Sequence, residues 1–180
     1  MAAPVKPQKV TANGKDSWWA VPAIAGPDAP TATEINALSG LNITCFLLAE
    51  QEGVTGNTSK TELARLLCET STTEGIDTTV WSMADLTGVF DPQAAAGADG
   101  KKAWALFKDG FTGYLVRRQG VVSTTDAAVQ AGDFVDVVPV ETGPATPSKT
   151  GTDASGIYAF TAAVAITGTP SFNVEVDPTS

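Results

Sequence analysis

The chain has 180 residues and a formal charge of −9, with 20 acidic residues against 11 Lys and Arg residues, and it contains no histidine. The acidic balance argues against tight binding of nucleic acids, although DNA would pass such a surface without sticking. The lack of histidine excludes histidine-based catalytic triads and the commonest zinc ligand. The length suits one compact domain. Only 17% of residues are charged, so we expect either that partners cover part of the surface or that small polar residues keep it soluble.

The first 84 residues predict four strands, because segments rich in β-branched and aromatic residues alternate with turn residues. These strands are Ser17–Ile24, Leu41–Leu48, Glu62–Cys68 and Thr78–Ala84. Residues 50–60 (EQEGVTGNTSK) are polar and show no periodicity. They predict a long loop that is either disordered or docked on something outside the monomer.

Two pairs of residues in these strands suggest contacts. Trp18 and Trp19 are consecutive, so on a strand their rings face opposite sides and cannot form one carbohydrate-binding platform. We expect one ring in the core and one at a subunit contact. Cys45 and Cys68 lie in apolar runs, which predicts buried, reduced thiols, with a disulfide between neighbouring strands as the alternative.

One helix is predicted over Gly100–Asp109, with Asp99 as its N-cap and Gly110 in the left-handed conformation that ends it. Apolar residues share one side of this helix and lysines the other: Ala103, Leu106 and Phe107, with Trp104 adjacent, against Lys101, Lys102 and Lys108. A single amphipathic helix over strands indicates an α+β fold or a helix-decorated sandwich.

The remaining chain predicts four more strands, namely Tyr114–Arg118, Phe134–Val140, Tyr158–Thr167 and Ser171–Val176. The third is the clearest, because large apolar residues alternate with small or polar ones: Tyr158, Phe160, Ala162, Val164 and Ile166. This period is typical of a strand with one buried face. Residues 142–156 are polar and predict another long loop.

No motif for catalysis, cofactor binding or metal binding stands out. Residues 97–101 (GADGK) lack the spacing of a phosphate-binding loop and are interpreted as the start of the helix. Asp133 and Asp136, near Glu141, lack EF-hand spacing and favour a solvated strand edge. Arg117 and Arg118 are too few for a nucleic-acid patch, and no apolar run is long enough to span a membrane.

A series of short motifs runs in order from about Trp18 to Val140. They are WAVPAI at 19–24, APT at 29–31, EIN at 34–36, LNITC at 41–45, RLLC at 65–68, GYLVRR at 113–118, AVQAGDFVD at 128–136 and VPV at 138–140. In this order and spacing the chain resembles the major tail proteins of long-tailed (siphovirus-type) actinobacteriophages. The resemblance is weaker over the final pair of strands.

The resemblance implies a mainly β tail-tube fold, with two sheets packed as a sandwich or barrel and one flanking helix. In that family, and in the similar tubes of contractile tails and type VI secretion, six subunits form a ring around a closed inner barrel. Closure removes exposed sheet edges, and head-to-tail stacking of rings grows a filament. The implied role is structural and not enzymatic, with no cofactor.

The resemblance also implies partners and a location. The partners are further copies of the chain, a tape measure protein, a tail terminator and distal tail proteins, with double-stranded DNA only in transit. The expected location is the virion tail, after assembly in the host cytoplasm and without a membrane.

Mapped onto this chain, residues 1–180 form a single tail-tube domain. Residues 1–17 and 142–156 are candidate inter-subunit arms, and residues 50–60 are the candidate stacking loop, with contacts from Glu50, Glu52, Asn57 and Lys60. The lumen is expected to be net negative, so that DNA slides without releasing counterions. Its candidate lining residues are Glu69, Glu74 and Asp77.

Two other functions fit the strand pattern. A capsid or tail decoration protein with an immunoglobulin-like sandwich has similar alternation, but it does not polymerise into a tube. A β-sandwich enzyme such as a glycosidase needs paired carboxylates in a cleft.

Overall fold

A computed structural model describes residues 9–49, 51–123, 128–151 and 155–178. The chain is mainly β, as predicted, and its described strands form three sheets. The elements are β1 (Asp16–Val21), α1 (Ala32–Ile35), β2 (Leu41–Asn42), β3 (Thr55–Glu62), β4 (Glu74–Ser82), β5 (Leu86–Val89), α2 (Asp99–Phe107), β6 (Phe111–Gln119), β7 (Phe134–Thr142), β8 (Thr146–Lys149), β9 (Tyr158–Ala162), β10 (Val164–Ile166) and β11 (Ser171–Glu175).

The centre of the body is an antiparallel sheet in the order β10-β7-β6-β1-β2, with β11 also paired to β7. Trp18 and Trp19 project to opposite faces of this sheet, as their spacing predicts. Their exposed fractions are 4% and 2%, so both rings are buried. The expectation that one of them lies at a subunit contact is therefore wrong, because this sheet is covered on both faces.

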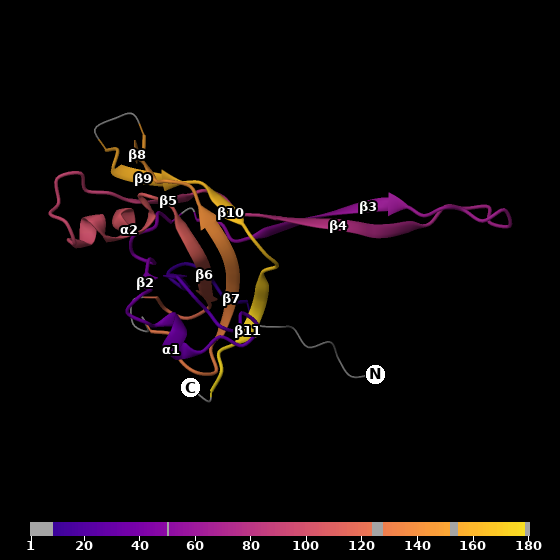
Figure 1. The fold of residues 1–180 in the computed structure, drawn as a ribbon, viewed down its shortest axis with the longest axis horizontal. Helices are drawn as coiled ribbons and strands as arrows, with labels where there is room; N and C mark the ends of the chain where they lie inside the picture. The colour runs from indigo at the N-terminus through magenta and orange to yellow at the C-terminus, as the bar shows by residue number, and fades with distance from the viewer. Residues whose placement is uncertain (1–8, 50, 124–127, 152–154, 179–180) are drawn as a thin grey trace.

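Each face of the central sheet has its own core. On one face, Trp18, Leu115 and Val138 pack with α2 and with the smaller sheet β5-β9-β8. On the other face, Trp19 and Val116 pack with residues that include Ile35 of α1. The molecule is thus a sandwich with α2 at its flank and α1 beneath the other face (Figure 1).

The predicted helix is present as α2, although it begins one residue earlier and ends two residues earlier than predicted. Asp99 is not the N-cap of α2; it is the first helical residue, and its carboxylate pairs with Lys102 at 2.7 Å. The hydrogen bond from Lys102 lowers the pKa of Asp99. Gly110 has a φ of 91°, as predicted for a left-handed helix end. Helix α1 was not predicted, although Thr31 and Glu34 form a capping box at its start.

The predicted strand 158–167 divides between two sheets. Residues of β9 pair with β5 and β8, whereas β10 pairs with β7 of the central sheet. The strand is interrupted at Ala163, so one run of alternating residues contributes a strand to each of the two sheets. Phe160 and Ala162 are buried as predicted, but Tyr158 at the start of the run is 61% exposed.

A long antiparallel hairpin, β3 and β4, projects away from the body (Figure 1). We call residues 55–82 the arm. The predicted loop 50–60 is therefore wrong from Thr55 onward, where the chain is a strand. The predicted strand Glu62–Cys68 is wrong after Glu62, because the next residues form the turn at the end of the arm.

Leu41–Leu48 is also shorter as a strand than predicted, since β2 ends at Asn42 and a turn follows. Cys45 lies in that turn and Cys68 at the end of the arm, so both thiols are exposed and free. The prediction of buried thiols is wrong, because neither apolar run enters a core at its cysteine. The alternative of a disulfide is also wrong.

The two terminal candidates for inter-subunit arms have different surroundings. Residues 1–8 lie outside the described part of the chain, and the segment 1–17 ends within β1. The segment 142–156 includes β8, which pairs with β9 of the same chain from Thr146 to Lys149. At least this part of the predicted polar loop is therefore a strand of the smaller sheet.

Candidate assembly surface

The arm is held together by its backbone ladder and by pairs of hydroxyl groups across its two strands. Thr55 lies 3.0 Å from Ser82 between their hydroxyl oxygens, and the corresponding distance for Thr58 and Thr79 is 2.9 Å. Such cross-strand pairs each contribute roughly 0.2–1 kcal/mol. The strands are exposed along both faces. A two-stranded hairpin without a covering layer is only marginally stable in water.

The end of the arm carries apolar side chains that no core covers. We call Leu63, Leu66 and Leu67 the tip leucines; their exposed fractions are 51%, 63% and 110%. Leu66 donates its backbone N–H to the Glu69 carboxylate at 2.8 Å, which orders the turn. Isolated exposed leucines are ordinary, but three at the end of a projecting hairpin form a patch suited to a protein partner.

The root of the arm is fixed to the body by close approaches. Gly53 passes against the guanidinium of Arg117, where a Cβ atom would overlap the side chain. Arg117 donates from Nε to Asp16 Oδ1 at 2.9 Å and lies over the Trp18 ring at 5.1 Å. The hydrogen bonds to Asp16 raise the pKa of Arg117. Thus Arg117, read from sequence only as half of a basic pair, supports the start of the arm.

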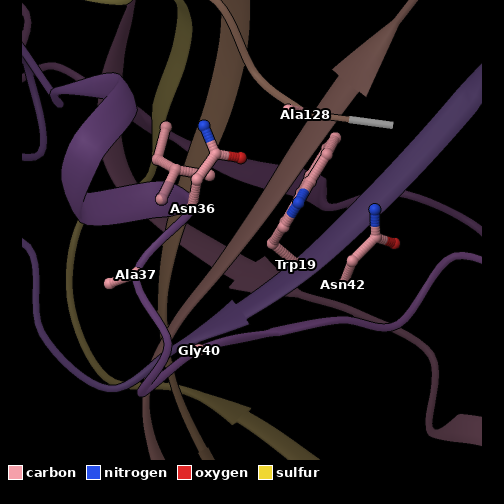
Figure 2. A pocket seen from close by; sticks show the side chains of 7 residues that line it. Trp19, Asn36, Ala37, Gly40, Asn42 and Ala128 are labelled. Carbon is pink, nitrogen blue, oxygen red and sulfur yellow. The ribbon is translucent and has the colours of Figure 1, made fainter. Parts of the chain in front are cut away.

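The body has a shallow pocket of about 300 Å³ at the end of α1. Figure 2 shows that Trp19 and the amide side chains of Asn36 and Asn42 line it. The Asn36 amide donates to the Val129 carbonyl at 2.8 Å and accepts from the Val129 N–H at 3.1 Å. Its polar group holds the chain around Val129, and the lining lacks the paired carboxylates that a glycosidase needs.

Residues 3–179 match the family described as phage tail tube protein. The chain belongs to the phage tail tube protein family. No curated protein matches the chain in a search of individual sequences.

As a tail tube protein, the chain is a structural subunit of the virion tail and assembles with copies of itself into a tube. The family is not an enzyme family. Among the described residues, no group of three or more His, Cys, Asp or Glu side chains is arranged to hold a metal ion. In the same part of the chain, no helix has the length and apolar character needed to cross a membrane.

Of the four predicted stacking residues of this tail tube protein, the structure places two, Asn57 and Lys60, on the arm. Glu50 lies outside the described residues, and Glu52 is exposed just before the root. Asn57 and Lys60 are exposed on β3. Lys60 pairs with Glu74 of β4 at 3.5 Å, with both side chains 64% exposed, so this surface pair adds little to stability.

The predicted lumen residues lie on the same arm. Glu74 and Asp77 are on β4, and Glu69 is in the turn at the tip. Stacking and lumen lining were predicted for separate segments, but the hairpin brings Asn57 and Lys60 onto the same arm as the predicted lumen residues. The exposure of the tip leucines was not predicted, because their apolar run was interpreted as a buried strand. The polar stretches on either side of this run were the available signal.

The acidic residues near β7 are structural in this tail tube protein. Asp133 pairs with Arg118 at 2.8 Å, and Arg118 lies over the Trp19 ring at 5.3 Å with an exposed fraction of 1%. Asp136 accepts the Asn173 N–H at 2.8 Å. Asp133 is therefore not the solvated group expected from sequence; it balances a buried charge.

Proposed function

We propose that this tail tube protein forms hexameric rings, and that the rings stack into the tube of a long-tailed actinobacteriophage through which DNA is ejected. Two observations support the proposal: the family match over nearly the whole chain and the free-standing arm with exposed leucines. The arm carries the argument, because it extends beyond the body of its own chain (Figure 1). With eight residues, β3 alone spans about 26 Å.

In this proposal the arm crosses from one ring to a neighbouring subunit. Its exposed strand edges and tip leucines then become buried, which satisfies backbone groups and removes apolar surface from water. The polar strands make the arm soluble before assembly. Residues 1–17 and 142–156 remain candidates for further inter-subunit contacts, and Glu52, Asn57 and Lys60 for stacking.

The lumen is proposed to be net negative, in keeping with the formal charge of −9. Glu69, Glu74 and Asp77 remain candidates for its lining. Repulsion between these carboxylates and phosphate would let DNA pass without release of counterions. An electropositive lumen in a cryo-EM reconstruction of the tube would overturn this part of the proposal.

The proposed partners at the two ends and inside the tube are a tail terminator, distal tail proteins and a tape measure protein. Assembly is proposed to occur in the host cytoplasm, with growth beginning on a tail-tip complex. These assignments come from the resemblance to actinobacteriophage tail proteins and not from the arm itself.

Electron microscopy of the purified protein tests the proposal, alone and with a tail-tip complex. The wild-type chain is expected to form hollow tubes with six-fold rings. A matched variant replaces residues 63–73 with an Asn-Gly turn, which keeps β3 and β4 but removes the tip. It is expected to keep the far-UV circular dichroism of the body and to form no tubes. Wild-type particles that remain single subunits even with the tail-tip complex would overturn the proposed rings and their stacking.

A further inference from the structure

The direction of the arm is set at its root by an aromatic contact with the body. Trp81 lies near the end of β4 and faces Gly56 of β3 in the strand register. A Cβ atom added to Gly56 would lie 2.5 Å from Cζ3 and 2.9 Å from Cε3 of the indole. The ring therefore packs directly against the backbone of β3, in space that any side chain larger than hydrogen would occupy.

Trp81 also reaches the body. Its ring centroid lies 5.4 Å from that of Phe172, with an interplanar angle of 52°. Phe172 belongs to β11, which is paired to β7 of the central sheet. An aromatic pair at this separation contributes about 0.5–1.5 kcal/mol beyond the area that it buries. The indole thus contacts β3 of the arm on one side and β11 of the central sheet on the other.

An irregularity in β11 aims Phe172 outward. The pairing of β11 with β7 shifts register between Ser171 and Val174. Within this bulge, Asn173 has a φ of 51° and donates its backbone N–H to Asp136 at 2.8 Å. Asparagine tolerates this left-handed conformation better than most residues. Bulges commonly redirect a side chain, and here the side chain lies against the root of the arm.

We propose that Trp81 is a positioning residue: held between Gly56 and Phe172, it fixes the angle at which the arm leaves the body. The angle matters because the arm is long. A rotation of about 10° at the root moves a point about 26 Å along the strand by about 5 Å, which is the spacing of one strand. The consequence for assembly rests on the proposed function, whereas the fixed angle is a property of the single subunit.

The chain's two cysteines allow the angle to be measured without introducing new ones. Cys45 is on the body and Cys68 is at the tip, and both are exposed and free. Nitroxide labels on both report the distribution of tip-to-body distances by pulsed electron paramagnetic resonance. Trp81→Ala and Phe172→Ala are expected to broaden this distribution about twofold, because the hairpin loses its support. Trp81→Phe is expected to keep it narrow.

Tyr158→Ala is the matched control, since Tyr158 is an exposed aromatic residue on β9 of the smaller sheet. Phe172 is 43% exposed, so its replacement leaves the folded body intact even if the Trp81 variant is unstable. An unchanged, narrow distribution in Phe172→Ala overturns the fixed angle. Broadened distances with normal tube yield overturn the link to assembly. If the wild type makes no tubes but the variants broaden, the proposed function fails while the positioning role stands.

Discussion

Replacing Leu67 with serine is expected to raise the subunit concentration needed for tube growth and to leave the isolated subunit as stable as before. The Leu67 side chain is 110% exposed, so within one subunit it contributes no buried area. Exposed substitutions of this kind change the free energy of unfolding by about 0.5 kcal/mol or less. Any larger effect must therefore come from contacts between subunits.

The size of the effect follows from the area that the partner covers. Burying a leucine side chain contributes roughly 1.5–3 kcal/mol. Because 1.4 kcal/mol corresponds to a tenfold change in an equilibrium constant, loss of this contact raises the critical concentration by roughly 10- to 100-fold. Sedimentation of tubes over a concentration series measures this value as the protein left in the supernatant.

Leu38 provides the matched control for this experiment. It is also a leucine, with an exposed fraction of 105%, but it lies on the body between α1 and β2. Leu38→Ser is expected to assemble at the wild-type concentration. Equal critical concentrations for the wild type and Leu67→Ser would refute the reasoning, provided that urea unfolding shows equal stability for the two proteins.

Three further substitutions test the body. Asp133→Asn is expected to reduce the free energy of unfolding in urea by about 3 kcal/mol, because it removes the carboxylate that pairs with the buried charge of Arg118. Gly88→Ala is expected to lower it by about 1–3 kcal/mol, since the new Cβ would lie 2.6 Å from Phe160. The pKa of Glu34 is lowered by hydrogen bonds from backbone N–H groups, of which that of Ala25 is the largest contribution. The ionised carboxylate thus stabilises the fold above pH 4.5, and this contribution is lost as the pH falls through the lower folded pKa; Glu34→Gln is expected to remove that part of the acid dependence.

Controls separate these effects from general damage. Asp109→Asn changes an exposed carboxylate next to α2 and is expected to leave stability unchanged, whereas an equal loss in both Asn variants would contradict the role of Asp133. Thermal melts between pH 3 and 7 compare Glu34→Gln with the wild type. Parallel curves over that range would show that the capping box carries no pH-dependent stability.

The sequence predicted best the strands with a core around them. Residues 114–118 and 134–140 lie inside β6 and β7, where apolar and β-branched residues are buried on the central sheet. The pair Trp18 and Trp19 correctly indicated opposite faces. The prediction that one of these rings lies at a subunit contact was wrong. The spacing of two residues on a strand shows which face each ring is on, but not whether another layer of the same chain covers that face.

The arm could not be found by the same argument. Alternation reports a buried face, and β3 has none, so Thr55–Glu62 carries no period that distinguishes it from a loop. The apolar run that starts at Leu63 had the opposite effect: it predicted a buried strand, although its residues are exposed at the tip. In both cases no layer of the same chain covers these residues, so burial within one subunit leaves no pattern to read.

The contact between Trp81 and Phe172 could not be predicted from the sequence either, for a different reason. Trp81 and Phe172 are 91 positions apart, and no local pattern links them. Their contact depends on the bulge at Asn173. A strand predicted from alternating residues is assumed to be regular, so the bulge was not predicted. Helix α1, in contrast, had a local signal, because Thr31 and Glu34 have the spacing of a capping box.

The lack of a covering layer over the arm is also expected to affect how fast tubes form. Beyond its root, the arm is ordered by little more than its own ladder, and fixing such a chain costs about 1–2 kcal/mol of backbone entropy per residue. When two free subunits associate, both arms lose this entropy at the same time. A subunit that joins an existing end contacts an arm that is already ordered. Growth from an end is therefore expected to be faster than the start of a new filament, so polymerisation is expected to show a lag that preformed seeds abolish.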